Sequence, residues 1–118
     1  MEDVNIQYYL VYKKQIPVGY LKLNFGEAQN EHIHKSSLEI ERLYVVKEYQ
    51  NQNIGQFLIE KAFAVAKQNK LVLVWLGVWE KNPGGIKFYK RNGFVEFDKH
   101  LFLLGMDEQT DILMKLEI

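Results

Sequence analysis

The chain has 118 residues, 47% of them apolar, and equal numbers of acidic and basic side chains give it a formal net charge of zero. This length provides one hydrophobic core, so we expect a single domain over 1–118, and the balanced charge offers no basic surface for a nucleic acid or an anionic membrane. The absence of cysteine excludes disulfides and thiolate zinc sites, which agrees with a cytoplasmic protein, and no apolar run approaches the roughly 20 residues of a membrane-spanning helix.

The first part of the chain predicts a hairpin, a loop and a third strand. Residues 6–25 hold two runs rich in tyrosine, valine and leucine around the polar sequence KKQ, which is typical of a β-hairpin. Residues 26–37 are polar and aperiodic and predict a loop. In the strand 38–46, the apolar positions change parity near Glu41 and Arg42, which predicts a β-bulge with freed backbone groups. The alternative is a regular strand in which Tyr44 faces solvent.

A helix and a buried strand follow. The apolar residues take a helical period from Ile54 to residue 69. The next run, LVLVWLGVW at 71–79, is apolar throughout, which predicts a strand covered on both faces and paired in parallel. The order strand, helix, strand predicts a right-handed crossover.

The last third predicts a second helix and two strands. Asn82 is placed as an N-cap before Pro83, and Gly93 is placed as a left-handed C-terminal cap. Residues 93–97 and 110–118 read as strands. The fold class is therefore α/β, with a mixed, strongly twisted sheet and helices packed on it.

The junction before the first helix is the candidate binding site. Backbone N–H groups at a helix start favour phosphate, and the amide-rich sequence QNQNIG, with Gly55 for close approach, precedes this one. Neither the Walker pattern nor GxGxxG occurs. The alternative is a solvated cap, which is the more common role of such a turn.

Two stretches resemble the GCN5-related N-acetyltransferases. IERLYVVKEYQNQNIGQFLIEKA is similar to their strand, loop and helix, whose pattern [QR]-x-x-G-x-[GA] binds the pyrophosphate of acetyl-CoA. Gln50 takes the first position and Gly55 the last, while Asn53 replaces the usual first glycine. NPGGIKFYKRNGF is similar to N-x-x-A-x-x-F-Y-x-x-x-G-F, with Gly85 where alanine is usual. The resemblance implies acetyl-CoA as cosubstrate and transfer of its acetyl group to a primary amine.

Residues 74–82, FYKRNGF and 100–114 are most similar to the PaiA type, which implies a polyamine acceptor such as spermidine or spermine. Members of the family carry a strand and two helices before the hairpin at which this sequence begins, so we expect a shortened version of the fold. We also expect the strand near residues 8–12 to be an unpaired edge, and therefore a homodimer. The rival hypothesis is a non-catalytic acyl-CoA-binding or interaction module of the same fold.

The resemblance assigns roles to individual residues. The cofactor-binding residues are expected to be Leu43, Tyr44 and Val45 of the strand, the loop residues Gln50, Asn51, Gln52, Asn53, Ile54 and Gly55, and Asn82. Backbone N–H groups around 43–45 would also form an oxyanion hole. Glu41 is the candidate base, acting through water, and Tyr89 is the candidate acid that protonates the departing thiolate. The alternatives are a solvated carboxylate for Glu41 and a packing role for Tyr89.

Several other residues favour ordinary explanations. His32 and His34 have no third metal ligand near them in the sequence, so a solvated loop is the simpler hypothesis and no metal is expected. Trp75 and Trp79 are expected in the core. The acidic residues Asp107, Glu108 and Asp111 could attract a polycation, although a solvated surface is the more common explanation.

Overall fold

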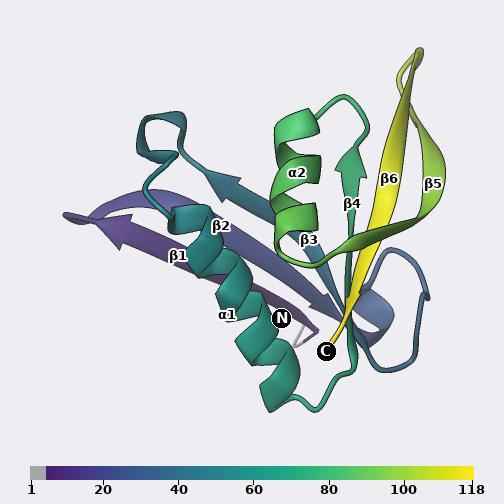
Figure 1. Cartoon of the computed structure of the whole chain (residues 1–118), viewed down its shortest axis with the longest axis horizontal. Coiled ribbons are helices and arrows are strands. Elements are labelled where there is room, and N and C mark those ends of the chain that lie inside the picture. Colours follow the sequence, from purple (N-terminus) through teal and green to yellow (C-terminus); the bar gives the residue numbers. More distant parts are fainter. Residues whose placement is uncertain (1–4) are drawn as a thin grey trace. The chain divides into compact units, whose positions relative to one another are not determined.

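The computed structural model describes residues 5–118, and for Phe102 and Leu104 it describes the backbone alone. These residues form six β-strands and two α-helices, and the strands follow the order β1-β2-β3-β4-β6-β5 in one sheet. The predicted α/β fold with a mixed sheet is therefore confirmed. The described chain divides into two compact units, one up to Val74 together with Ile118 and the other Trp75–Glu117. Figure 1 labels the helices and strands of each.

The first unit begins with the predicted hairpin. Strand β1 (Ile6–Lys13) pairs antiparallel with β2 (Ile16–Phe25), which pairs antiparallel with β3 (Ser37–Val45). Lys14 and Gln15 form the turn with φ of 49° and 69°. Two consecutive residues of positive φ match the twist of the strands, as in primed hairpin turns. Pro17 and Gly19 lie inside β2, beyond the turn.

The bulge predicted in the third strand is confirmed. Leu23 of β2 faces Ile40, whereas its neighbour Lys22 faces Arg42, so Glu41 is an extra residue on β3. Tyr44 is nevertheless exposed, at 52%. The bulge and the solvent-facing tyrosine, which the sequence presented as alternatives, therefore occur together.

Helix α1 (Ile54–Gln68) packs on β2 and β3. Its apolar stripe is buried with the inner face of these strands, and the core consists of Val18, Leu21, Leu23, Leu38, Ile40, Ile54, Leu58, Ile59, Ala62, Val65 and Ala66. The first turn of α1 lies close to β2 at Gly19, where a Cβ would stand 3.0 Å from the Tyr44 carbonyl oxygen and 3.2 Å from Ile54 Cγ2. A glycine at this position therefore sets how closely the helix start approaches the sheet.

The second unit holds most of β4 (Leu73–Trp79), α2 (Pro83–Arg91), β5 (Val95–Leu104) and β6 (Asp107–Glu117). Strands β5 and β6 form an antiparallel hairpin that is longer than predicted, because β5 continues beyond residue 97 to a turn at Gly105 with φ of 63°. The polar residues at 98–100 interrupt the apolar pattern of the strand and concealed this continuation.

The prediction for the two tryptophans of β4 is half wrong. Trp75 is in the core at 2% exposure, but Trp79 is 45% exposed. The first four residues of β4 are buried, and from Gly77 on buried and exposed positions alternate. The end of the strand therefore has one covered face, although its sequence is apolar throughout.

Candidate active site

The loop before α1 contains two residues of positive φ and ends at a helix start whose first N–H groups are not capped by the Asn53 side chain. A short 3-10 helix, η2 (Lys47–Tyr49), leads into Asn51 and Asn53, whose φ angles are 66° and 64°. Asn53 is the N-cap residue in left-handed conformation, its side chain makes no capping hydrogen bond, and no acid lies in the first turn. Left-handed geometry at Asn53 agrees with its place in the motif, because asparagine tolerates positive φ better than most residues. The helix start thus keeps the positive end of its dipole open to an anion.

The side chains of this loop are partly engaged within the protein. Gln50 Nε2 donates to the Val45 carbonyl oxygen at 3.1 Å, and Gln52 Oε1 accepts from Lys13 Nζ at 2.6 Å. Residues 51–53 are exposed. Two of the four side-chain amides of the loop are therefore engaged within the protein, and Lys13 at the end of β1 lies beside the loop.

The strand segment expected to bind the pantetheine arm lies in regular register. Leu43, Tyr44 and Val45 pair with consecutive residues of β2, and the residue left out of the ladder is Glu41, two positions earlier. The Tyr44 and Tyr20 rings lie 5.9 Å apart, at an interplanar angle of 46°. The bulge therefore frees backbone at Glu41, while 43–45 keep the extended conformation that a strand-like ligand contact requires.

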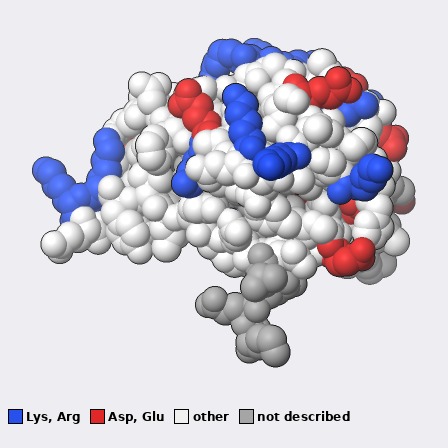
Figure 2. Space-filling view, turned by 90° about the horizontal axis from the view of Figure 1, so that it is seen from below, with Lys and Arg blue, Asp and Glu red and all other residues white. Residues whose placement is uncertain are grey.

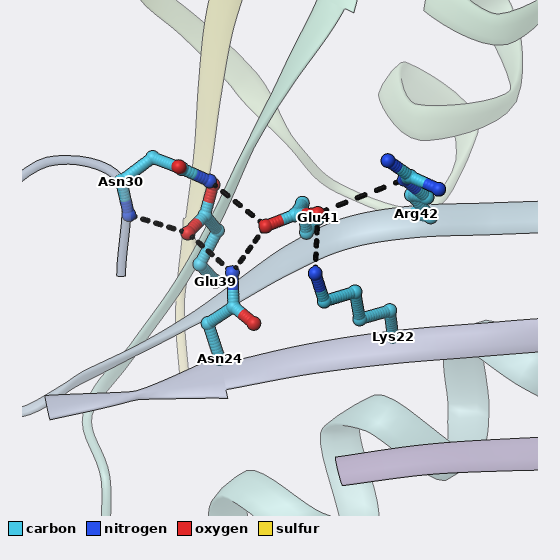
Figure 3. A network of polar contacts seen from close by, with 6 residues as sticks. All are labelled: Lys22, Asn24, Asn30, Glu39, Glu41 and Arg42. Atoms are coloured by element: carbon cyan, nitrogen blue, oxygen red, sulfur yellow. Dashed lines mark hydrogen bonds and ion pairs between the residues drawn. The ribbon is translucent and has the colours of Figure 1, made fainter. Parts of the chain in front are cut away.

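Glu41 is the centre of a polar network on β2, β3 and the loop between them (Figure 3). Its Oε2 lies 2.8 Å from Lys22 Nζ and 3.6 Å from Arg42 Nε. Its Oε1 accepts from Asn24 Nδ2 at 2.8 Å and from Asn30 Nδ2 at 3.1 Å. The carboxylate is thus surrounded by four donors, two of them charged.

These donors decide the ionisation of Glu41. Burial by itself would raise the pKa of Glu41, but the hydrogen bonds from Lys22, Asn24 and Asn30 outweigh it and lower the pKa to about 2. The same contact with Glu41 raises the pKa of Lys22. The pair is therefore fully ionised at neutral pH, and in this state Glu41 is a weak base.

Glu39 is a second carboxylate of this network, and the sequence analysis did not single it out. It is 4% exposed and accepts from Asn24 Nδ2 at 3.0 Å, from Asn30 N at 2.8 Å and from Asn30 Nδ2 at 2.9 Å. The available signal was weak: two acids two residues apart in a strand, opposite an asparagine. Glu39 and Asn30 fasten the β2–β3 loop beside Glu41.

In the second unit, Asn82 and Tyr89 lie on α2. Asn82 Oδ1 accepts from Gly85 N at 3.0 Å, which confirms the predicted cap, and Pro83 is in the first turn. The Tyr89 ring packs edge-on against Phe88 and Phe94, with centroids 5.3 and 5.7 Å away. Burial raises the pKa of Tyr89 to about 12, although by its accessible surface the residue is half-buried, like the other covered residues of α2. Tyr89 is therefore a neutral donor at physiological pH.

The remaining charged groups are dispersed. His34 Nδ1 accepts from Ser36 N at 2.9 Å, and His32 Nε2 lies 3.9 Å from Glu27 Oε2. Basic and acidic side chains are interspersed on the face seen in Figure 2. No helix in the part of the chain that the structure describes has the length and apolar character needed to cross a bilayer.

Comparison with known proteins gives one consistent family. Residues 2–94 match the model of the Acetyltransferase (GNAT) family. An uncharacterised N-acetyltransferase from the pepI 3' region of Lactobacillus delbrueckii subsp. lactis is 43% identical over 97 residues, which are 82% of this chain and 56% of that protein. The chain thus spans little more than half the length of this curated relative.

Solved structures share the fold at low sequence identity. The PaiA N-acetyltransferase of Thermoplasma acidophilum, in complex with coenzyme A, has a TM-score of 0.75 at 24% identity, over 97% of this chain and 62% of that one. The ribosomal-protein-S18-alanine N-acetyltransferase of Escherichia coli has a TM-score of 0.80 at 17% identity, over 99% of this chain and 72% of that one. These two neighbours differ in their named substrates, so the likeness concerns the fold.

Proposed function

Because the chain belongs to the acetyltransferase (GNAT) family, we propose that it binds acetyl-CoA and transfers the acetyl group to a primary amine. The observation that carries this proposal is the uncapped start of α1, where Asn51 and Asn53 hold positive φ in the segment that matches the pyrophosphate loop. Non-glycine residues in this conformation are uncommon and often accompany binding sites. The pyrophosphate would accept from the backbone N–H groups of residues 51–55, since the N–H of Gln50 already donates to the Lys47 carbonyl oxygen, with Lys13 as an additional cation.

The strand β3 would bind the rest of the cosubstrate. Its residues 43–45 would hydrogen-bond the pantetheine arm through their backbone, and their N–H groups would stabilise the oxyanion that develops on the thioester carbonyl. Asn82 is proposed as a further side-chain partner, through its Nδ2, since its Oδ1 caps α2. These roles rest on the family resemblance.

The chemical step needs a base and an acid. An aliphatic ammonium with a pKa of about 10.4 must lose a proton before its nitrogen can attack. We propose that Glu41 accepts this proton through water, that the new N–C bond forms as the C–S bond breaks, and that Tyr89 gives its hydroxyl proton to the thiolate and recovers it from solvent. The neutral hydroxyl of the half-buried Tyr89 supports the second role.

The low pKa of Glu41 favours a second candidate function. A carboxylate with a pKa of about 2 accepts a proton from an ammonium poorly, so the resting state suits a non-catalytic acyl-CoA-binding module as well as an enzyme. The acceptor itself is proposed from the PaiA-like residues as a polyamine such as spermidine. We also propose a cytoplasmic homodimer, supported by the position of β1 at one end of the strand order, with Tyr8, Leu10 and Tyr12 more than half exposed.

Two measurements test the proposal separately. Calorimetric titration with acetyl-CoA tests binding, and Gly55→Val should weaken it at least tenfold by blocking backbone approach, whereas Glu60→Val, an exposed position of the same helix, should leave it unchanged. Release of free thiol from acetyl-CoA and spermidine tests transfer. Binding without thiol release from any primary amine would select the binding module, and unchanged affinity in a folded Gly55→Val variant would remove the loop assignment.

A further inference from the structure

The Lys22 ammonium occupies a site that has the composition of an ammonium receptor. Its Nζ lies 2.8 Å from Glu41 Oε2 and 5.7 Å from the centroid of the Tyr8 ring (Figure 3 shows the contact with Glu41). A carboxylate and an aromatic face are the groups that bind primary ammonium ions in proteins. Here both are provided by strands that flank β2, the strand of Lys22 itself.

A buried amide in this network lacks one of its partners. Asn24 is 1% exposed, and its Nδ2 donates to both Glu39 and Glu41 at 3.0 and 2.8 Å. Its Oδ1 is buried and has no hydrogen-bond partner among the described residues. In Figure 3 this oxygen is turned to the side on which Lys22 lies. A buried acceptor without a donor is costly, and it points to an N–H group of a ligand.

Lys22 is suited to leave this site. The Lys22 side chain is 16% exposed, and lysine has a flexible aliphatic stem that can move the ammonium away from Glu41. Arg42 Nε remains 3.6 Å from the same carboxylate, so Glu41 is not left without a cation when Lys22 moves. The group that Lys22 would make room for is chemically its own equivalent, a primary ammonium.

We propose that Lys22 is an internal stand-in for the acceptor, and that the acceptor's ammonium binds Glu41, Tyr8 and the Asn24 amide oxygen by displacing the Lys22 ammonium. This inference rests on the proposed transfer to a primary amine and names the residue that controls access to its base. The Lys22 ammonium would occupy the Glu41 carboxylate until an acceptor ammonium displaces it.

Loss of the Lys22 ammonium without a replacement would change the strength of the base. The groups that face Glu41 are Lys22 and Asn24 from β2, Arg42 and Glu39 from β3, Asn30 from the loop and, beyond Lys22, Tyr8 from β1. The hydrogen bond from Lys22 is the largest of the contributions that lower the pKa of Glu41, so its loss raises that pKa. A bound acceptor replaces the Lys22 ammonium by another ammonium, so Glu41 stays a weak base until the acceptor has lost its proton, and the raised pKa is seen in Lys22→Met without the acceptor.

The test uses butylammonium as a probe that is independent of the polyamine proposal. Its binding, without acetyl-CoA, is followed by NMR on the Asn24 side-chain amide. Lys22→Met should tighten butylammonium binding roughly fivefold, because in the wild type the Lys22–Glu41 ion pair, at ordinary strength, leaves Glu41 free for only a small fraction of the time. Lys61→Met is the matched control, since Lys61 lies 5.0 Å from the Tyr9 ring centroid with no carboxylate partner among the described residues, and it should change nothing. Tetramethylammonium, which has the charge but no N–H group, should bind much more weakly.

The outcomes separate this proposal from the proposed function. Tighter butylammonium binding and a raised Glu41 carboxyl pKa in Lys22→Met would support it even if no thiol were released. Unchanged affinity, or shifts that avoid Asn24, would overturn it even if acetyl transfer proceeded. If Lys22→Met does not fold, the wild-type protein still decides, because butylammonium must then shift the Lys22 Nζ and Asn24 amide signals together.

Discussion

Replacing Glu41 by glutamine should lower the stability of the protein in a manner that depends on pH. In the folded protein the pKa of Glu41 falls from 4.5 to about 2, which corresponds to about 3.4 kcal/mol if none of the interaction is screened. The Glu41 side chain is 22% exposed, so solvent screens part of the interaction and we reduce this value to about 1–2 kcal/mol. At neutral pH, Glu41→Gln should therefore lower the free energy of unfolding by about this amount, since Lys22 and the two asparagines lose a charged acceptor.

The sign of the pH dependence follows from the direction of the shift. Because the folded pKa lies below the unfolded value, the stabilisation by Glu41 is complete above pH 4.5 and is lost as the pH falls toward about 2. The difference in stability between wild type and Glu41→Gln should be constant from pH 7 to pH 5 and shrink below pH 4.5. Other carboxylates titrate in both proteins, so the difference isolates Glu41.

Urea denaturation at pH 7, 5, 4 and 3 measures this difference, provided that the slope with urea is the same in both proteins. Glu60→Gln, at an exposed position of α1, is the control and should track the wild type at every pH. A difference that stays the same down to pH 3 would show that the network does not depress the pKa of Glu41 in solution. The account of its weak basicity would then be wrong.

Three further predictions concern α2, Tyr89 and β1. Gly84→Ala should stabilise the protein by about 0.5–1 kcal/mol through helix propensity. Gly85→Ala should give almost no gain, because its Cβ would stand 2.6 Å from Asn82 Nδ2 and displace the capping side chain. Equal gains of the two variants in thermal melts would contradict this. Tyr89→Phe should keep acetyl-CoA affinity and lower kcat by roughly 10²-fold, and wild-type turnover would return Tyr89 to packing alone. Sedimentation equilibrium at micromolar concentration should show a dimer that Tyr8→Lys weakens by placing a charge on the exposed edge strand, and a wild-type monomer would refute the self-association.

Local signals in the sequence were sufficient for most elements of the fold. Apolar periodicity located α1, the Asn82-Pro83 pair located the start of α2, and the change of parity located the bulge at Glu41. The errors fall where burial depends on more distant parts of the chain. Trp79 lies in an apolar run but at the exposed end of β4, and a pattern of residue types does not show where the cover over a strand stops.

The network around Glu41 was beyond such reasoning for a different reason. Its members come from β2, from β3 and from the loop between them. Lys22 contacts Glu41 only because the β2–β3 register and the bulge together bring Lys22 opposite Arg42. A slip of one residue would send Lys22 to the other face of the sheet. Candidate residues can be recognised from a motif, but their charge state depends on this register, which the motif does not contain.

The bulge at Glu41 combines two features that the proposed reaction needs, a carboxylate on the polar face of β3 and a strand segment 43–45 held beside the start of α1. One extra residue turns the Glu41 carboxylate into the polar face with Glu39, Lys22 and Asn24, while Ile40 and Leu43 on either side keep their places opposite Leu23 and Leu21. The core packing of β3 against α1 is thereby preserved, and the start of α1 stays fixed beside residues 43–45 through the close approach at Gly19. A regular strand could not satisfy both requirements, because restoring the alternation would either bury the carboxylate under α1 or expose Leu43. In the proposed reaction, the irregularity in β3 is therefore the feature that would allow one short segment to serve both the cosubstrate and the amine.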